Sequence, residues 1–324
     1  DFTSATLPNP SFSLAPTLAA APDSADFLNL VPGTFDVEED ELQALDDGWA
    51  LVGATCTDGT DLRTNNFEVE LSPGEDVTCT FINAPLGSST IIKNTVGGDG
   101  IFDYTGTAPF LGLSLDTSIM GGMASQDYTN QLDPLDNPYV IIEDDPAPDG
   151  FELTALECLE MGGTDINGLP VADNTTTDLA NRRADINADY NEMVTCTFTN
   201  TANGSLTIRK QTAPDEVDQL FGFTSAEADL TGSIRDFDIA AEELVLDAQP
   251  GPYSTTETVP AGWQITGIAC TGQTTSTVTY TGATTSPTDG FEPGDDTVNV
   301  TLAAGEDVVC EFTNTQEGSI TINK

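Results

Sequence analysis

The sequence predicts an all-β protein built from three tandem β-sandwich domains. Apolar and polar residues alternate with a period of two, and Gly, Pro, Asn and Asp interrupt the alternation at short intervals. No convincing helical stripe is present. A threefold internal repeat runs through the 324 residues, and the six cysteines fall as one pair in each repeat unit. This length accommodates two or three domains of ordinary size.

The repeat is defined by three spacings. An aromatic residue stands seven positions before a cysteine in each unit: Trp49 and Cys56, Phe151 and Cys158, Trp263 and Cys270. An asparagine follows the second cysteine by four positions: Cys79 and Asn83, Cys196 and Asn200, Cys310 and Asn314. A lysine follows each asparagine by ten positions: Lys93, Lys210 and Lys324. These spacings place the domains at residues 1–84, 85–202 and 203–317, with a further strand at 318–324.

The cysteines are expected to form one disulfide per domain: Cys56–Cys79, Cys158–Cys196 and Cys270–Cys310. Paired cysteines at matching positions of a repeat indicate an oxidising compartment. Free buried thiols in a cytosolic protein are the alternative. Metal binding by these cysteines is disfavoured, because no unit offers four soft ligands.

Charge and composition exclude several classes of function. The net charge is −46, from 54 acidic and 8 basic residues, so the surface repels nucleic acid and anionic membranes. Such a surface suits a soluble polymer in high salt, where the repulsion is screened. No apolar run is long enough to insert into a membrane. The lack of histidine excludes His-based catalysis and most zinc sites, and no cofactor is expected.

The repeat units are out of phase with the chain. Lys93 opens the second domain and Lys210 opens the third, whereas residues 1–84 contain no lysine. Segment 318–324 is then a spare strand. We expect it to complete the first domain of another copy, either within a longer tandem array or by donor-strand insertion between subunits. Both give a head-to-tail contact that does not close into a ring. The alternative is a chain boundary without a role in assembly.

The alternation of strand faces also places a glutamate in each core, beside the lysine and the asparagine of the repeat. An aromatic residue precedes a glutamate by four positions in each domain: Phe35 and Glu39, Tyr139 and Glu143, Tyr253 and Glu257. Residues two and four apart share a face of a strand, so these glutamates face the core while Glu38 faces outward. By the same test Lys93 shares a face with Ile91, and Asn200 with Phe198. Each core should therefore receive a lysine, a glutamate and an asparagine.

A covalent bond explains why a lysine is buried there. Burial favours the neutral amine and the protonated glutamic acid. The amine is then a nucleophile, and the acid polarises the asparagine carboxamide. Loss of ammonia leaves a Lys–Asn isopeptide bond, once per domain and without turnover. The alternative is a buried Lys–Glu ion pair in which asparagine satisfies the remaining hydrogen bonds.

These residues resemble the CnaB-type, prealbumin-like (SpaA-like) domains of bacterial surface adhesins and pilins. The resemblance rests on a lysine ending the first strand, a glutamate before a Pro-x-Gly-aromatic stretch, and a terminal Phe-Thr-Asn-Thr strand. The third domain shows these as Lys210, Glu257-Thr-Val-Pro-Ala-Gly-Trp263 and Phe312-Thr-Asn314-Thr. The second domain matches in the same way, and the first has lost the proline. The disulfides are not a usual family feature, and no Leu-Pro-x-Thr-Gly sorting signal is visible.

The resemblance implies Ig-like or prealbumin-like sandwiches with autocatalytic isopeptide bonds between Lys93 and Asn200 and between Lys210 and Asn314. For the first domain it implies Lys324 of a neighbour bonded to Asn83. Glu39, Glu143 and Glu257 would promote these reactions. We therefore expect a structural, non-enzymatic subunit of an extracellular filament, pilus or stalk at the cell surface.

Two weaker signals remain. Asp185, Asn187 and Asp189 alternate as oxygen ligands do in a calcium loop, but the glycine and distal glutamate of that loop are missing, so a solvated acidic loop is favoured. Residues 159–192 read as an irregular insertion, either a spacer or a binding loop. A surface adhesin that uses the domains as a rigid spacer is the alternative function, with its ligand unknown.

Overall fold

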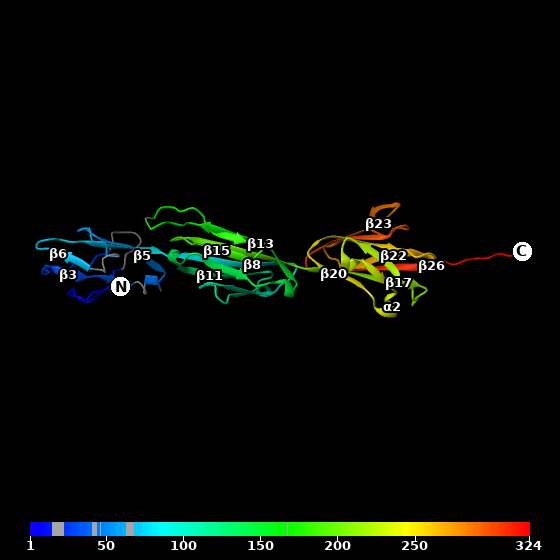
Figure 1. Ribbon diagram of the computed structural model, residues 1–324, viewed down its shortest axis with the longest axis horizontal. Helices are drawn as coiled ribbons and strands as arrows, with labels where there is room; N and C mark the ends of the chain where they lie inside the picture. The colour runs from blue at the N-terminus through cyan, green and yellow to red at the C-terminus, as the bar shows by residue number, and fades with distance from the viewer. Residues whose placement is uncertain (15–22, 41–43, 46, 63–67, 167) are drawn as a thin grey trace.

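The computed structural model describes residues 1–324 except 15–22, 41–43, 46, 63–67 and 167. Three β-rich bodies follow one another along a single long axis, and the C-terminal segment runs out at the end opposite the first domain (Figure 1). The predicted all-β fold of tandem sandwiches is confirmed. Among the described residues, no helix combines the length and apolar composition needed to span a bilayer.

The second domain consists of two sheets, with strand orders β11-β8-β16-β13 and β10-β9-β12-β15-β14. Its strands are β8 (Gly87–Val96), β9 (Ile101–Gly106), β10 (Ser114–Asp116), β11 (Met123–Leu132), β12 (Tyr139–Glu143), β13 (Phe151–Met161), β14 (Thr176–Asp178), β15 (Arg183–Ile186) and β16 (Met193–Ala202). Its short 3-10 helices are η1 (Thr117–Ile119), η2 (Pro134–Asp136) and η3 (Ala147–Asp149).

The third domain repeats this plan, with strand orders β20-β17-β26-β22 and β19-β18-β21-β25-β23-β24. Its strands are β17 (Gly204–Ala213), β18 (Phe221–Ser225), β19 (Gly232–Ile234), β20 (Leu244–Ala248), β21 (Gly251–Thr258), β22 (Trp263–Thr271), β23 (Thr277–Gly282), β24 (Thr285–Thr288), β25 (Thr297–Leu302) and β26 (Asp307–Gln316). Its helices are η4 (Ala228–Leu230) and α2 (Phe237–Ala240).

The first domain is less complete in its described residues. It has sheets β2-β1-β4, β3-β6 and β5-β7. The strands are β1 (Phe2–Thr3), β2 (Ser11–Phe12), β3 (Gly33–Asp36), β4 (Glu38–Glu39), β5 (Trp49–Cys56), β6 (Glu68–Leu71) and β7 (Cys79–Pro85). Its buried apolar cluster of Leu51, Ala54, Cys56, Leu62 and Val69 is much smaller than those of the other two domains.

The lysine-bearing strand lies at the centre of one sheet in each complete domain. β8 pairs in parallel with β16, and β17 with β26, so each lysine strand runs beside the strand that carries the asparagine. Alternation along these strands puts Ile91 and Lys93, or Ile208 and Lys210, fully inside the sandwich. The alternating strands β8 and β17 therefore belong to the sheet that carries the lysine and the asparagine.

The expectation that residues 159–192 form an irregular insertion is corrected by the structure. The stretch begins with the end of β13 and contains β14 and β15. β15 pairs with β12, and its Ala184 and Ile186 are fully buried in the core. The alternation in Arg183–Ile186 spans only four residues between polar segments, which is why the pattern was missed.

Candidate functional site

In the second domain, the three predicted residues meet in the core. Glu143 on β12 reaches across from the facing sheet, and its Oε1 lies 2.7 Å from Lys93 Nζ on β8. The same oxygen accepts a hydrogen bond of 2.5 Å from Asn200 Nδ2 on β16. All three side chains are fully buried. The lysine nitrogen and the asparagine amide nitrogen are therefore held against one carboxylate oxygen.

Burial controls the electrostatics of this group. It lowers the pKa of Lys93 to about 8, although the charge and hydrogen bond of Glu143 partly oppose the shift. The Lys93 Nζ lies 4.3 Å from the centroid of the Phe102 ring. The lysine has an aromatic face and one carboxylate around it in place of water, which is the environment that makes an amine nucleophilic near neutral pH.

In the third domain, the same three positions meet with different contacts. Asn314 Nδ2 donates to Glu257 Oε1 at 2.5 Å. Lys210 Nζ lies 3.9 Å from Glu257 Oε2 and donates to the Phe312 carbonyl oxygen at 2.7 Å. That carbonyl belongs to the asparagine strand, two residues before Asn314. The lysine is thus held beside the asparagine by the backbone of β26.

The pKa values of Lys210 and Glu257 are both shifted in the direction that favours the uncharged form of each group. Burial lowers the pKa of Lys210 to about 8, against the raising effect of neighbouring carboxylates, Glu257 foremost. Burial raises the pKa of Glu257 to about 7, against the lowering effects of Lys210 and of the Asn314 hydrogen bond. Because the shifts converge, a neutral amine beside a protonated carboxylic acid becomes accessible near pH 7.

In the first domain, two of the three positions are in place. Glu39 is buried, and its Oε1 accepts a 2.8 Å hydrogen bond from Asn83 Nδ2, while Oε2 has no hydrogen-bond partner. Glu38 is exposed, as strand parity predicts. No ion pair to Glu39 is present among the described residues, and residues 1–84 contain no lysine.

The core around Asn83 is open where the lysine strand runs in the other domains. β7 has one strand partner, β5, in the described part of the chain. Phe81 on β7 is only partly buried, whereas its counterparts Phe198 and Phe312 are fully buried. Leu28 is 78 % exposed, while its counterparts Leu132 and Leu246, which pair with the lysine strand, are 0 % and 6 % exposed. Among the described residues, an edge and an apolar surface of the first domain therefore lack a covering strand.

The segment 318–324 lies apart from this opening. It has no strand pairing in the single chain, and Ile320 and Ile322 are 92 % and 90 % exposed. The structure therefore does not bring Lys324 to Glu39 or Asn83 of its own chain. The segment is an exposed strand sequence at one end of the molecule, and the uncovered β7 lies in the domain at the other end (Figure 1).

The structure contains the three predicted disulfides, and each joins the asparagine strand to its antiparallel neighbour. Cys56–Cys79 links β5 to β7, Cys158–Cys196 links β13 to β16, and Cys270–Cys310 links β22 to β26. The cysteines are directly opposite each other in all three ladders. Each disulfide thus clamps the strand that carries the asparagine.

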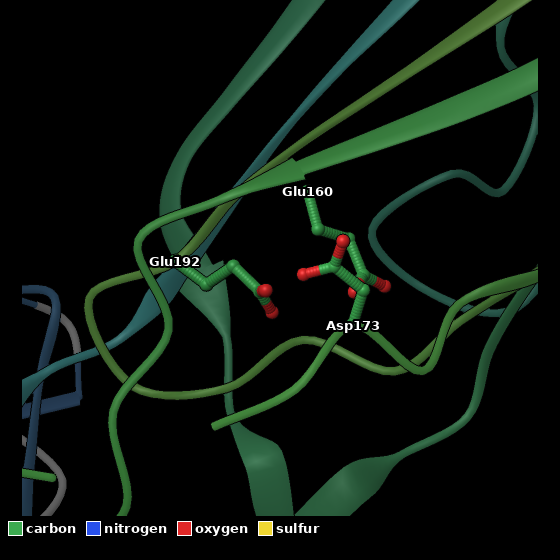
Figure 2. A group of neighbouring side chains, drawn as sticks. All are labelled: Glu160, Asp173 and Glu192. Carbon is green, nitrogen blue, oxygen red and sulfur yellow. The ribbon is translucent and has the colours of Figure 1, made fainter. Parts of the chain in front are cut away.

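The proposed calcium ligands do not converge. Asp185 pairs with Arg183, and the Asn187 side chain donates to the Asn174 carbonyl oxygen. A different set, Glu160, Asp173 and Glu192, brings its carboxylates together, with oxygen atoms within 4.8 Å of one another (Figure 2). Burial and the neighbouring carboxylates raise the pKa of Glu192.

Sequence reasoning missed the aromatic residues that cover the lysines. Phe102 lies over Lys93, and Phe221 lies over Lys210 at 4.5 Å. Phe102 is the second residue of β9 and Phe221 is the first residue of β18, the strands that follow the lysine strands. Each stands two positions before another aromatic residue, Tyr104 or Phe223. Phe2 pairs with Glu39 as Tyr104 pairs with Glu143 and Phe223 with Glu257. Aligning these aromatics would have revealed the pattern.

Two family models, each described as a prealbumin-like fold domain, match the chain. One matches residues 89–202 and again 206–316, and the other matches residues 49–85. Comparison with curated proteins returns no significant match.

Solved structures with a similar arrangement include three bacterial proteins. The major pilin of Streptococcus pyogenes is 8 % identical, with 72 % of this chain and 99 % of that chain covered and a TM-score of 0.25. The pilus adhesin SpaC of Lactobacillus rhamnosus GG is 13 % identical, covering 78 % and 32 %, with a TM-score of 0.28. The Bacillus anthracis TIE protein is 11 % identical, covering 88 % and 54 %, with a TM-score of 0.26.

These superpositions score low, so the assignment rests on the family models. The two matches of the first model take in both complete sandwiches, each with its lysine, glutamate and asparagine. The chain belongs to the SpaA-type family of prealbumin-like fold domains.

Proposed function

We propose that this chain is a structural subunit of an extracellular filament, pilus or stalk, joined head to tail through segment 318–324. The observation that carries the proposal is the incomplete site of the first domain. Glu39 and Asn83 are in contact there, the edge of β7 is uncovered, and an exposed strand ending in Lys324 lies at the opposite end of the chain.

Within the second and third domains, the buried groups form isopeptide bonds. Neutral Lys93 Nζ attacks the Asn200 side-chain carbonyl carbon, the new carbon–nitrogen bond forms, and the bond to Nδ2 breaks. Glu143 takes the proton from Nζ and delivers it to Nδ2, which leaves as ammonia. Because Glu143 Oε1 already contacts both nitrogens, the carboxylate needs no large movement between the two proton transfers. Lys210, Glu257 and Asn314 react in the same way.

In the first domain, segment 318–324 of another copy supplies the lysine. The strand registers of the second and third domains support a specific position for it. Ile91 and Ile208 lie opposite Cys196 and Cys310, and Lys93 and Lys210 lie opposite Phe198 and Phe312. By the same register the donor strand runs parallel to β7, with Ile322 opposite Cys79 and Lys324 opposite Phe81. Ile320 and Ile322 then enter the open core, and Lys324 reaches Glu39 and Asn83.

The structural role is supported by how the bonds are placed. In each complete domain the disulfide and the Lys–Asn pair both join a neighbouring strand to the strand that carries the asparagine, so a strand that would bear a pulling force is clamped twice. Disulfides persist in oxidising surroundings, which supports a location outside the cell. The chemistry occurs once per domain and without turnover, so the protein is not an enzyme in this proposal.

The test is covalent assembly of the purified chain. We expect a ladder of multimers that resists SDS and reductant, because its links are amide bonds. Lys324→Ala and Asn83→Ala should each abolish the ladder, while mass spectrometry still shows two ammonia losses per chain from the internal bonds. A ladder that persists in Lys324→Ala would exclude this linkage.

A synthetic peptide of residues 316–324, added in excess, should cap the first domain and stop the ladder. Its adduct should map to Asn83 after proteolysis. The same peptide with lysine replaced by alanine should bind without forming an adduct. We call the uncovered position beside β7, where the donor strand would lie, the open slot. If the lysine peptide neither reacts nor binds, the proposal that this slot accepts segment 318–324 is contradicted.

A surface adhesin is the second candidate. Leu159 and Met161 at the end of β13 are 62 % and 63 % exposed, and Met161 pairs with the half-exposed Met193. This apolar end lies within residues 159–192, where a binding surface was expected. A chain that forms no ladder and captures no donor peptide would favour this role.

A further inference from the structure

The exit of the chain from each domain is held by one recurring backbone hydrogen bond. The third residue after the site asparagine donates its N–H to the carbonyl oxygen of a glycine just before the domain's tryptophan or phenylalanine. The pairs are Leu86 to Gly48 at 2.9 Å, Asn203 to Gly150 at 2.8 Å, and Glu317 to Gly262 at 2.8 Å. All three glycines have positive φ, between 78° and 84°.

This bond exists in the third domain although no further domain follows in the structure. In the first two domains it orients β8 and β17 into the domain that follows. The segment after Glu317 therefore leaves the third domain with the same anchor that serves the two internal junctions. The donor strand is presented in a defined direction, along the long axis (Figure 1).

At each junction the following domain contacts the preceding one through a loop. Two residues of this loop stand six and five positions before the second cysteine of the following domain. In the second domain, Tyr190 packs against Ala50, Val52 and Leu86 at the junction with the first domain. The neighbouring Asn191 N–H donates to the Pro85 carbonyl oxygen across that junction at 2.9 Å. This loop therefore touches the strand end and exit residue of the preceding domain.

The same loop forms the second junction. Ala304 and Gly305 of the third domain lie against Gly97 of the second domain. A Cβ atom added at Gly97 would fall 2.5 Å from Ala304, and one added at Gly305 would fall 1.8 Å from the Gly97 carbonyl oxygen. The two domains thus approach backbone to backbone, in a contact that tolerates no added side chain.

The first domain has the same loop without a neighbour. Pro73 and Gly74 stand six and five residues before Cys79, as Tyr190 and Asn191 do before Cys196. Gly74 has a φ of 77°, matching the positive φ of Asn191 and Gly305. Pro73 is exposed, and nothing lies within 4 Å of a Cβ built at Gly74. The first domain therefore has an exposed loop that corresponds to the loops with which the second and third domains contact the domain before them.

We infer that the Pro73–Gly74 loop docks on the exit end of the third domain of another copy, so that the contact between subunits repeats the junction between the first and second domains. The Gly74 N–H would donate to the Gln316 carbonyl oxygen, because Gln316 pairs with Trp263 as Pro85 pairs with Trp49. This inference rests on the proposed strand donation and adds a second, non-covalent contact to it. The subunits are then held as stiffly as the domains within one chain.

Hydrogen exchange on three samples tests this docking. They are the Ile322→Asp, Lys324→Ala double variant alone, in which the segment can neither insert nor react, the same variant capped with the wild-type 316–324 peptide, and the covalently joined wild-type chains. β7 should become protected in both occupied samples, because both fill the slot. Residues 74–76 should slow by about tenfold or more only in the joined chains, because the peptide brings the strand without the third domain.

Each outcome separates the two proposals. Protection of β7 in both occupied samples, with residues 74–76 exchanging equally in the two, overturns the docking and leaves strand donation standing. Protection of neither segment overturns both. A third outcome is that the first domain captures the peptide but the chains do not join. It overturns both the docking and the strand donation between chains, because the end of the first domain that is proposed to dock should not prevent assembly. The samples need high ionic strength. Gly97, which Gly305 contacts at the second junction, stands four residues after Lys93, and the position four residues after Lys210 is Pro214, next to Asp215 and Glu216. In the docked pair Glu75 and Asp76 would therefore approach these acidic residues.

Discussion

Glu143 Oε1 accepts hydrogen bonds from Lys93 and from Asn200, two nitrogens that come from adjacent parallel strands. The carboxylate comes from the opposite sheet. A one-residue shift in any of the three strands would turn its side chain out of the core. The contacts of this site are therefore a consequence of strand register, and in the proposed reaction the glutamate is the residue on which both proton transfers depend.

Glu143→Gln should block the bond in the second domain, because glutamine cannot accept the lysine proton and pass it on. Intact mass should show one ammonia (about 17 Da) fewer lost per chain. Without a cross-link that closes a loop on the order of 100 residues, the free energy of unfolding of this domain should fall by about 4–5 kcal/mol. Denaturant melts of the isolated monomer measure this.

Glu152→Gln is the matched control, since Glu152 is an exposed glutamate on β13 of the same domain. Its mass and stability should equal those of the wild type. Retention of both ammonia losses in Glu143→Gln would show that the glutamate is not required.

Asn314→Ala leaves Lys210 and Glu257 as free groups and should make the stability of the third domain depend on pH in a characteristic way. Between about pH 8 and the ordinary lysine pKa near 10.4, the unfolded chain carries a proton that native Lys210 lacks, so stability rises with pH. Between the ordinary glutamate pKa near 4.3 and about 7, native Glu257 holds a proton that the unfolded chain lacks, so stability falls.

The minimum should therefore lie between pH 7 and 8. Urea unfolding at a series of pH values, followed by the fluorescence of buried Trp263 in a Trp49→Phe background, measures this curve. In the chain with Asn314 intact we expect the lysine nitrogen to be an amide that cannot titrate, so the rise above pH 8 should be absent. The same rise in both proteins would mean that no bond forms.

At the scale of the element, β7 and segment 318–324 are the two parts that the proposed strand donation would join. β16 and β26 each lie between two strands, whereas β7 has only β5 among the described residues. An uncovered edge beside a partly exposed core is costly to leave open, and strand addition resolves it. The Cys56–Cys79 disulfide holds β5 and β7 together, so the proposed acceptor strand is tied to its neighbour without a donor.

Ile322→Asp should slow multimer formation at least tenfold, because its counterparts Ile91 and Ile208 are fully buried and a carboxylate there would lose its hydration. The rate of ladder growth on reducing gels measures the effect.

Asn323→Asp is the control, since its counterpart Arg209 lies on the outer, partly exposed face. It should assemble at the wild-type rate. Equal rates for the two variants would exclude insertion of this segment into a core.

At the scale of the whole molecule, the three domains form a rod whose ends differ (Figure 1). The domain at one end has the exposed Pro73–Gly74 loop and a β7 that pairs only with β5 among the described residues, and the exposed segment 318–324 follows the domain at the other end. Contacts between unlike ends do not close on themselves, so repeated joining gives a linear polymer. The net charge of −46 resists lateral association of such rods except where salt screens it.

Residues and spacings in the sequence were sufficient to predict the sandwich fold, the cysteine pairs and the convergence of lysine, glutamate and asparagine. These depend on period-two alternation, which is local and directly readable. The choice of Glu39 over Glu38 is an example, because only one of two neighbours can face the core. The strands hidden in residues 159–192 were missed, since four alternating residues are too short a signal.

Only the tertiary structure decided what depends on contacts between distant segments. It shows that Lys93 contacts Glu143 directly while Lys210 is held by a carbonyl of β26, that Glu160, Asp173 and Glu192 converge, and that one glycine bond anchors every exit. It also shows that β7 is left without a second partner in the described chain. A sequence specifies which face of a strand is buried, but which edges meet depends on how whole sheets pack in space.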